Sequence, residues 1–420
     1  MSDRRFGRLT ALGGEAVERE VTALVREAGE LVERHLDRRD YRALVLLGGY
    51  GRGEGGVEER DGVERPHNNL DLLLITPGFG GARGTSLKRR LDELFRPLAA
   101  RSGVGIDTGV IGELKLRTSP CLVMWFDMRF GHKTVAGDAS LVPSLSRFRK
   151  ERIEPADMLA LLVNRGSLLV INRALLERPS LGTRPSLGED ARRTIVKHAM
   201  KAIIGYGDAL LFAIGDYEAS YLEKQRRMRA RSDVAPSIRA LYEEALSFRF
   251  RPRYADYLSR DLGAFMDDVE AAVEPIHLRF EAHRLGVSAL GVPALGWEGY
   301  PALALRHALV ASPRSPRALA RKGKNLLSSL RASRALPGDI VELGLACNGP
   351  KNNLGVAFPA VLYEGARARF GDLAARIVGA PDASVASLRR AYLERWGEHG
   401  DSNFNAVAER LALGGAEVPS

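Results

Sequence analysis

The sequence predicts an α+β fold, with a small mixed sheet and helices over residues 1–148 and a mainly helical region over residues 149–420. Two observations lead to this division. Short apolar runs bounded by turn residues, which are typical of strands, are confined to the first part of the chain. Beyond about residue 150, apolar residues recur instead at the three- and four-residue spacing of amphipathic helices.

The first part of the chain alternates between helical and strand patterns. Apolar residues at helical spacing predict a helix at 15–37, and a Thr-Ser start with Gly103 at the end delimits a second helix at 85–103. Continuous apolar runs predict buried strands. These runs lie at 41–48, 70–75 and 104–112, and a further run at 121–130 predicts a fourth strand.

The second part of the chain carries helical periodicity almost throughout. It is clearest at residues 155–176, 189–215, 254–280 and 387–400. Segments rich in glycine, proline and asparagine predict joints at 178–190, 290–301 and 345–353. The joint near 290–300 would divide the helical region into two sub-bundles.

Composition bounds the class of protein. The 420 residues include only two cysteines, Cys121 and Cys347, neither with metal-ligand spacing. With no long apolar run and no signal segment visible, the sequence predicts a cytoplasmic protein without membrane contact. The net charge of +10, mostly from arginine, leaves two interpretations open. It favours an anionic partner such as nucleic acid, or it reflects arginine on solvated faces.

The most informative stretch is LGGYGRGEGGVEERDGVERPHNNLDLLLI, residues 47–75. Its glycines at 51, 53 and 56 match a dinucleotide-binding pattern, but the following residues lack the apolar stripe of the crossover helix which that pattern requires. No Gly-Lys-Ser/Thr follows, which excludes a P-loop of the Walker type. A glycine-rich hairpin with a flexible tip would explain the glycines, but not the arginine and the acid that follow them.

A nucleotide-binding turn explains the whole stretch. Gly48 and Gly49 would let the backbone approach a triphosphate closely, and Arg52 would hold phosphate oxygens with its fork of donors. The next strand would then present oxygen ligands for Mg²⁺. Asn69 and Asp71 are two residues apart on that strand and therefore point to the same face.

The motif Gly-Gly-Tyr-Gly-Arg-Gly-Glu, followed by Pro66 and the Leu70–Ile75 run, resembles the polymerase-β-like nucleotidyltransferase superfamily. It is most similar to the version in the uridylyltransferase of bacterial nitrogen regulation and its relatives. The resemblance covers roughly residues 40–140. It implies transfer of a nucleoside monophosphate from a nucleoside triphosphate, with Mg²⁺ or Mn²⁺ as cofactor. The acceptor would be a small molecule, a protein or an RNA.

The sequence departs from this family pattern at two places. The connection between Glu54 and Pro66 is long and acidic, and Asn69 stands where the resemblance expects the first acid of an Asp-x-Asp pair. A net loss of about 3 kcal/mol in metal binding would weaken affinity more than a hundredfold. Three alternatives follow: another acid substitutes, the metal enters with the nucleotide, or the protein is a degenerate nucleotide-binding or regulatory member.

The resemblance places a third carboxylate at Asp107, which would bind metal or act as general base, with Asp127 as the second candidate. Asp71, Asp107 and Asn69 are thus the predicted metal site. In the helical half, Lys201 and Asp208 share one helix face and are predicted to contact the nucleotide, unless they form an ion-pair ladder at a helix crossing. The basic tracts 224–233 and 314–334 suit either a polynucleotide or a solvated face.

Overall fold

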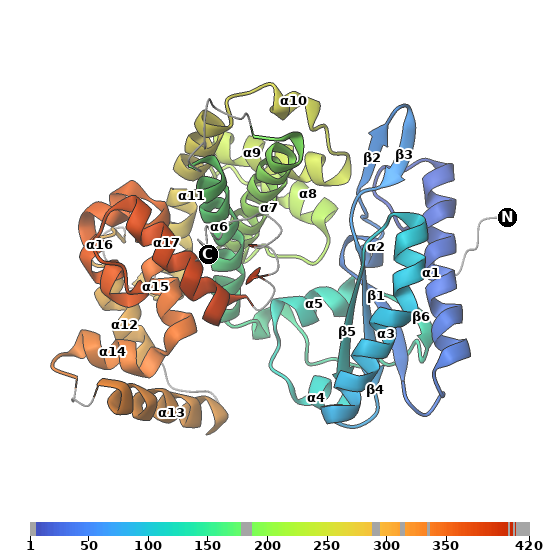
Figure 1. The fold of residues 1–420 in the computed structure, drawn as a ribbon, viewed down its shortest axis with the longest axis horizontal. Coiled ribbons are helices and arrows are strands. Elements are labelled where there is room, and N and C mark those ends of the chain that lie inside the picture. The colour runs from blue at the N-terminus through green and yellow to red at the C-terminus, as the bar shows by residue number, and fades with distance from the viewer. Residues whose placement is uncertain are drawn as a thin grey trace, which may run out of the picture. The chain divides into compact units, whose positions relative to one another are not determined.

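The computed structural model describes residues 6–177, 187–287, 295–310, 316–333 and 337–401, together with residues 404, 405 and 408. The chain divides into two compact units. Residues 1–158 and 215–254 form the first, called the sheet unit here, and residues 159–214 and 255–420 form the second, called the helical unit. Figure 1 shows strands in the first and helices throughout the second, so the predicted α+β fold class is confirmed.

A four-stranded mixed sheet forms the centre of the sheet unit. Its strands are β1 (Ala43–Leu47), β4 (Leu70–Thr76), β5 (Ile106–Gly112) and β6 (Lys133–Gly137), in the order β5-β4-β1-β6. Strand β1 pairs antiparallel with both β4 and β6, whereas β4 and β5 are parallel. The antiparallel pairing of β1 with β4 excludes the dinucleotide-binding interpretation, which requires a parallel crossover at this point.

Helices α1 (Glu15–His35) and α3 (Gly81–Ser102) cover one face of this sheet (Figure 1). Their apolar positions recur at helical spacing and meet alternate residues of β1 and β4, because side chains of a strand alternate between its two faces. The core that they form includes Val21, Val25, Leu91, Phe95, Leu44, Leu46, Leu70, Leu72 and Leu74. The other face of β4 therefore carries Asn69, Asp71, Leu73 and Ile75.

The connection between β1 and β4 is ordered into three elements. A short helix, α2 (Gly48–Arg52), follows β1, and strands β2 (Val57–Arg60) and β3 (Val63–Pro66) form an antiparallel hairpin. Asp61 and Gly62 both have positive φ, at 52° and 74°, as a two-residue hairpin turn of type I′ requires. The acidic connection is therefore an ordered β-hairpin rather than an irregular loop.

The predicted strand at 121–130 is wrong. Residues Val123–Phe130 form helix α5, and the fourth strand is β6, which begins three residues later. A short apolar run fits either a buried strand or a buried helix segment, because its periodicity does not separate the two. Here Val123, Trp125, Phe126 and Met128 are the buried positions. Helix α4 (Glu113–Thr118) and a 3-10 turn at Lys150–Arg152 complete this part of the chain.

Two helices from much later in the chain belong to the sheet unit. They are α8 (Tyr221–Ala230) and α9 (Pro236–Phe250), and they pack on each other. The sequence pattern predicts one division of the chain, after residue 148. In the structure, the first change of unit comes at residue 158, and the chain then returns for residues 215–254.

In the part of the helical unit that the structure describes, the chain forms a further series of helices. They are α6 (Pro155–Leu176), α7 (Glu189–Ala213), α10 (Ala255–Leu258), α11 (Leu262–Arg284), α12 (Tyr300–Val310), α13 (Pro316–Ser333), α14 (Ile340–Asn348), α15 (Pro350–Leu362), α16 (Glu364–Val378), α17 (Val385–Arg395) and a π-helical turn at Trp396–Gly400. Gly349, with φ +82°, separates α14 from α15 inside the predicted joint at 345–353. The predicted joints at 178–190 and 290–301, with the division between sub-bundles, lie partly outside the described residues.

An aromatic cluster forms the centre of the helical unit around His277 of α11. The His277 ring is fully buried, stacks on Phe358 and meets the rings of Tyr206, Trp297 and Tyr363 edge-on. Its Nδ1 lies 3.3 Å from the Tyr363 hydroxyl. Burial lowers the pKa of His277 from 6.5 to about 3, so the ring is neutral at ordinary pH.

Helix α6 is long and apolar enough to cross a membrane by length and composition. Half of the apolar window in this helix is buried inside the fold, and one such helix is weak evidence for a membrane span. The absence of membrane contact and the cytoplasmic location stay predictions.

Candidate functional site

The carboxylate of Asp71 lies close to the glycine turn after β1. Gly48 has φ +66°, a conformation that favours glycine, and a Cβ atom at this position would lie 2.1 Å from Asp71 Oδ2. Strand pairing sets this contact, because Leu47 of β1 and Asp71 of β4 are register partners. Asp71 is half-buried. The backbone of the turn thus lies against a carboxylate with no side chain between them.

The parallel pairing of β4 and β5 brings the other predicted site residues beside Asp71. Asp71 and Asp107 are direct register partners, so their side chains leave the sheet on the same face. Asn69, two residues before Asp71, donates a hydrogen bond from Nδ2 to Asp107 Oδ2 at 3.0 Å. Gly105 makes room for this amide, since a Cβ there would lie 2.5 Å from Asn69 Oδ1. Asn69 and Asp107 are exposed.

This group offers two carboxylates and one amide to a cation. Within the described ranges, no cluster of three or more His, Cys, Asp or Glu side chains could hold a metal. Mg²⁺, however, is commonly held by one or two carboxylates together with water and substrate phosphates. The residues present therefore fit a divalent cation that binds together with a nucleotide, and they do not form a closed all-protein cage.

Arg52 is enclosed by the sheet unit. Its side chain is only 7% exposed, with Nε 3.3 Å from Glu54 Oε2 and Nη1 3.7 Å from Asp127 Oδ2. Its guanidinium also lies over the Tyr221 ring at 4.5 Å. Burial alone would lower the Arg52 pKa, but Tyr221, Asp127 and Glu54 together raise it. Two carboxylates thus neutralise Arg52, and its role as a phosphate ligand stays a prediction.

Asp127, the second candidate for the third carboxylate, lies in α5 rather than in a strand of the sheet. Besides Arg52, it accepts a hydrogen bond from the Tyr217 hydroxyl at 3.0 Å. The carboxylate beside Asp71 in the register is Asp107.

Glu54, the acid of the glycine motif, anchors helix α8. Its carboxylate accepts hydrogen bonds from the backbone N–H groups of Tyr221 and Leu222, at 2.9 Å and 3.3 Å, and from the Ser220 hydroxyl. A carboxylate is stabilising at this end of a helix, where backbone N–H groups lack helical partners. This contact is not predictable from the local sequence, because the two segments are more than 160 residues apart.

A second arginine lies at the glycine turn and was also missed. A Cβ atom at Gly49 would lie 3.1 Å from Nη2 of Arg249, a residue of α9. The Arg249 guanidinium stacks over Tyr221 at 4.5 Å, and its Nε is buried without a hydrogen-bond partner. The local sequence, SFRFRPRY, alternates arginine with aromatic residues, which is the signal that could have drawn attention to it.

The acids of the β2–β3 hairpin are used elsewhere. Glu58 pairs with Arg60 at 2.8 Å and lies 3.3 Å from His67. Glu59 and Glu64 both pair with Arg251, which follows α9. Glu59 and Glu64 therefore link the hairpin to the end of α9, whereas Glu58 pairs within the hairpin and lies beside His67.

Lys201 and Asp208 lie on α7, in the helical unit. Asp208 is buried and Lys201 half-buried. Gly205, between them, faces α6: a Cβ there would lie 2.5 Å from the Arg165 side chain, so this glycine permits a close helix crossing. This crossing is consistent with the alternative interpretation, in which Lys201 and Asp208 lie in an ion-pair ladder at a helix crossing. A nucleotide contact by Lys201 or Asp208 stays a prediction.

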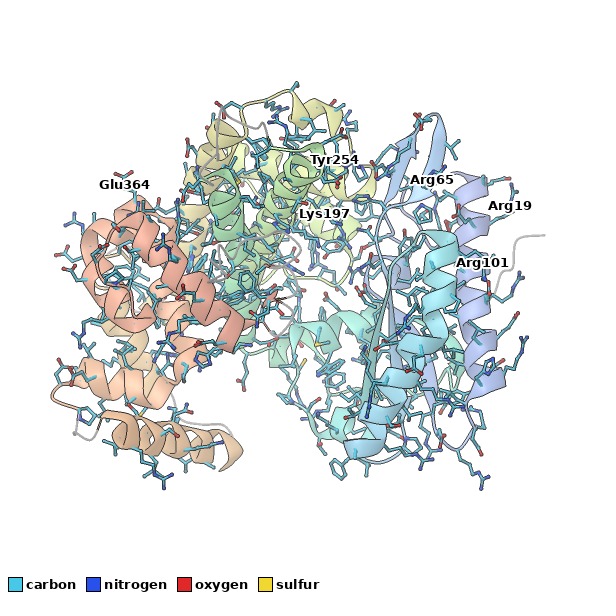
Figure 2. All side chains as sticks on the ribbon, in the orientation of Figure 1. Arg19, Arg65, Arg101, Lys197, Tyr254 and Glu364 are labelled. Atoms are coloured by element: carbon cyan, nitrogen blue, oxygen red, sulfur yellow. The ribbon has the colours of Figure 1, made fainter. Side chains whose placement is uncertain are left out.

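Much of the basic charge is paired. In the tract 224–233, Arg226 and Arg227 pair with Glu223, Arg229 with Glu243, and Arg231 with Asp216 and Asp233. Among the residues labelled in Figure 2, Arg19 pairs with Glu15 and Arg101 with Glu27. This pattern favours solvated faces over a polynucleotide surface. In the tract 314–334, the side chains of Arg317 and Arg321 lie outside the described residues.

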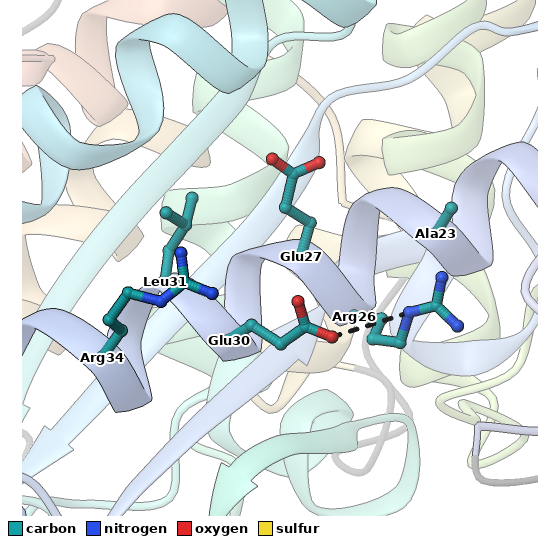
Figure 3. Close-up of a pocket in the computed structure, with 6 residues that line it drawn as sticks. All are labelled: Ala23, Arg26, Glu27, Glu30, Leu31 and Arg34. Carbon is teal, nitrogen blue, oxygen red and sulfur yellow. Dashed lines mark ion pairs between the residues drawn. The ribbon is translucent and has the colours of Figure 1, made fainter.

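A hollow of about 440 Å³ lies on the surface of α1 (Figure 3). Its lining residues are Ala23, Arg26, Glu27, Glu30, Leu31 and Arg34. All come from one helix, and Arg26 pairs with Glu30 at 3.8 Å across it. A hollow formed by the side chains of a single helix encloses no ligand, so we assign no site there.

Comparison with known proteins returned neither a matching family model nor a curated relative. The functional interpretation therefore depends on the residues and contacts around the glycine turn.

Proposed function

We propose that the sheet unit binds a nucleoside triphosphate and transfers its nucleoside monophosphate to an acceptor hydroxyl. The observation that supports this most directly is the register pairing of Asp71 with Asp107, with Asp71 against the side-chain-free turn at Gly48. The same residues carry the sequence resemblance. The acceptor, whether small molecule, protein or RNA, and the preferred base stay open.

Each residue has a role in this scheme. Gly48 and Gly49 let the backbone N–H groups of the turn approach the phosphates. Asp71 and Asp107 supply the carboxylate oxygens for Mg²⁺ or Mn²⁺, which would neutralise charge on the phosphates when bound. The acceptor oxygen attacks the α-phosphorus. The bond between the α-phosphorus and the oxygen that bridges it to the β-phosphorus breaks, and pyrophosphate leaves. Asp107, the exposed carboxylate, takes the hydroxyl proton.

One observation favours a second candidate function, a nucleotide-binding regulatory protein without transfer activity. The Asn69 amide donates to Asp107 Oδ2, so a hydrogen-bond donor occupies one of the oxygens that a metal would need. Weaker metal binding would then slow the chemistry while phosphate binding at the turn persists. Metal-independent nucleotide binding without turnover would support this alternative.

Labelled ATP, CTP, GTP and UTP, with Mg²⁺ or Mn²⁺ and a panel of acceptors, test the proposal. We expect Asp71→Asn to lower transfer by a factor on the order of 100 or more, as a loss of about 3 kcal/mol in metal binding implies. Asp92→Asn is the matched control. Asp92 bonds Thr108, the neighbour of Asp107 on the opposite face of β5, and should stay within a few-fold of the parent. Transfer that survives Asp71→Asn would refute the mechanism.

A further inference from the structure

Two arginines flank the Tyr221 ring beside the glycine turn, but they differ in their partners. Arg52 has Glu54 and Asp127 near its guanidinium. Arg249 lies at the same 4.5 Å from the Tyr221 ring, yet among the described residues no carboxylate pairs with it. The buried Nε atoms of both arginines lack a hydrogen-bond partner, so the difference between them is the pairing of Arg52 with two carboxylates. The arginine of the glycine motif is thus neutralised, whereas the arginine contributed by α9 is not.

Three basic side chains gather around the Tyr221 ring. Arg52, Arg249 and the buried Lys224 all lie within 4.7 Å of the Tyr221 ring centre, and Glu54 and Asp127 pair with Arg52. An electron-rich ring stabilises adjacent cations, and more so where they are shielded from water. The Arg249 charge is therefore held in place by Tyr221 and remains available to an anion.

The position of Arg249 defines which anion it suits. Its Nη2 would lie 3.1 Å from a Cβ at Gly49, and the Asp71 carboxylate would lie 2.1 Å from a Cβ at Gly48. Because consecutive Cα atoms are about 3.8 Å apart, the guanidinium and the carboxylate lie within about 12 Å of each other. Separations up to this limit are within reach of a polyphosphate chain that has one end at the guanidinium and the other at a cation held by Asp71.

We propose that Arg249 is the phosphate-binding cation of the glycine turn and that its ligand is the polyphosphate of a nucleoside triphosphate. The nucleotide part of this inference rests on the proposed function, whereas anion binding at the turn does not. A guanidinium holds phosphate through two parallel N–H···O bonds, and a missing side chain at Gly49 keeps the approach open. Arg52 then acts inside the unit by holding Glu54 and α5 together.

Calorimetry with inorganic triphosphate in EDTA tests this without metal or nucleotide. The parent protein should bind triphosphate, and Arg249→Gln should weaken binding ten- to a hundredfold, as expected for a charge-assisted bond. Arg249→Lys should keep part of the affinity for triphosphate, because the positive charge remains while the two parallel N–H donors of the guanidinium are lost. Arg229→Gln is the matched control, since Arg229 is exposed and paired with Glu243, and its affinity should equal that of the parent. Equal affinities of Arg249→Gln and Arg229→Gln, or no triphosphate binding by the parent, would overturn the proposal.

A second measurement uses only the unaltered protein, so it does not depend on the folding of a variant. Phenylglyoxal modifies accessible arginines, and mass spectrometry reports the extent at each position. Triphosphate should protect Arg249 and leave Arg229 unchanged. Modification of Arg249 at the same rate with and without triphosphate contradicts the proposal.

The two proposals can fail separately. If triphosphate binding requires Arg249 but no acceptor receives a nucleotide, the phosphate site stands and the transferase assignment falls. If transfer depends on Asp71 while Arg249→Gln leaves the KM for nucleotide unchanged, the transferase assignment stands and the role of Arg249 is refuted.

Discussion

Gly48→Ala should destabilise the glycine turn, because Gly48 lies against the carboxylate of Asp71. In Gly48→Ala, the new residue must keep φ +66°, which costs about 1–2 kcal/mol for an L-amino acid. Its Cβ would also lie 2.1 Å from Asp71 Oδ2, so the carboxylate or the turn must shift, and overpacking of this kind costs about 1–3 kcal/mol more. The total destabilisation of the turn is then about 2–5 kcal/mol.

A matched control separates the two contributions. Gly103, at the end of α3, has φ +67°, and a Cβ there meets nothing within 4 Å. Gly103→Ala should therefore cost only the backbone contribution of about 1–2 kcal/mol. In the double variant with Asp71→Ala, the destabilisation caused by Gly48→Ala should fall to the same value, because the clashing carboxylate is gone.

Native-state hydrogen exchange of peptides from β1 and β4 measures these differences locally, which suits a chain with two units that need not unfold together. The additional 1–3 kcal/mol predicts exchange that is roughly 5- to 150-fold faster in Gly48→Ala than in Gly103→Ala. Equal exchange in the two variants would show that Asp71 does not press against the turn, and the site geometry would then be wrong.

Three further predictions concern other residues. Glu54→Gln removes the charge at the start of α8 and should speed exchange of residues 221–230 by the equivalent of about 1–3 kcal/mol, whereas Glu15→Gln, at an exposed pair, should change nothing there. The depressed pKa of His277, about 3 against 6.5, means that the unfolded chain binds the proton more readily. The helical unit should thus lose about 1.4 kcal/mol per pH unit as pH falls from 6.5 towards 3, and His277→Phe should flatten this dependence in denaturation midpoints at pH 6.5 and 5. Asn69→Asp should raise the Mg²⁺ affinity of transfer by more than about a hundredfold, measured by metal titration, and unchanged affinity would place Asn69 outside the metal site.

Local patterns in the sequence predict the elements around the sheet well. The helix at 15–37 and the strands at 41–48, 70–75 and 104–112 correspond to α1, β1, β4 and β5 within a few residues. Each is either strongly periodic or bounded by turn residues, so short-range physics determines it. The error at 121–130 arises where an apolar run carries neither signal, and packing of α5 decides between helix and strand.

The candidate site is only partly readable from sequence, for a physical reason. Asn69, Asp71 and the turn at Gly48 lie close along the chain, and Asp107 follows from the strand–helix–strand order. Glu54 and Arg249 act through contacts that join segments more than 160 residues apart. Neither segment contains a local preference that names its partner, so such contacts emerge only from the fold.

The discontinuity of the sheet unit has a consequence for synthesis of the chain. The last sheet strand ends at Gly137, yet α8 and α9, which Glu54 and Tyr221 connect to the glycine turn, are complete only at Phe250. At roughly 5–20 residues per second, the ribosome needs about 6 to 23 s to cover that interval. During this time the buried Arg52 and the turn lack their covering helices. The glycine turn of the nascent chain is therefore exposed to solvent and to chaperones until α8 and α9 have been made, which follows synthesis of residues 159–214 of the helical unit.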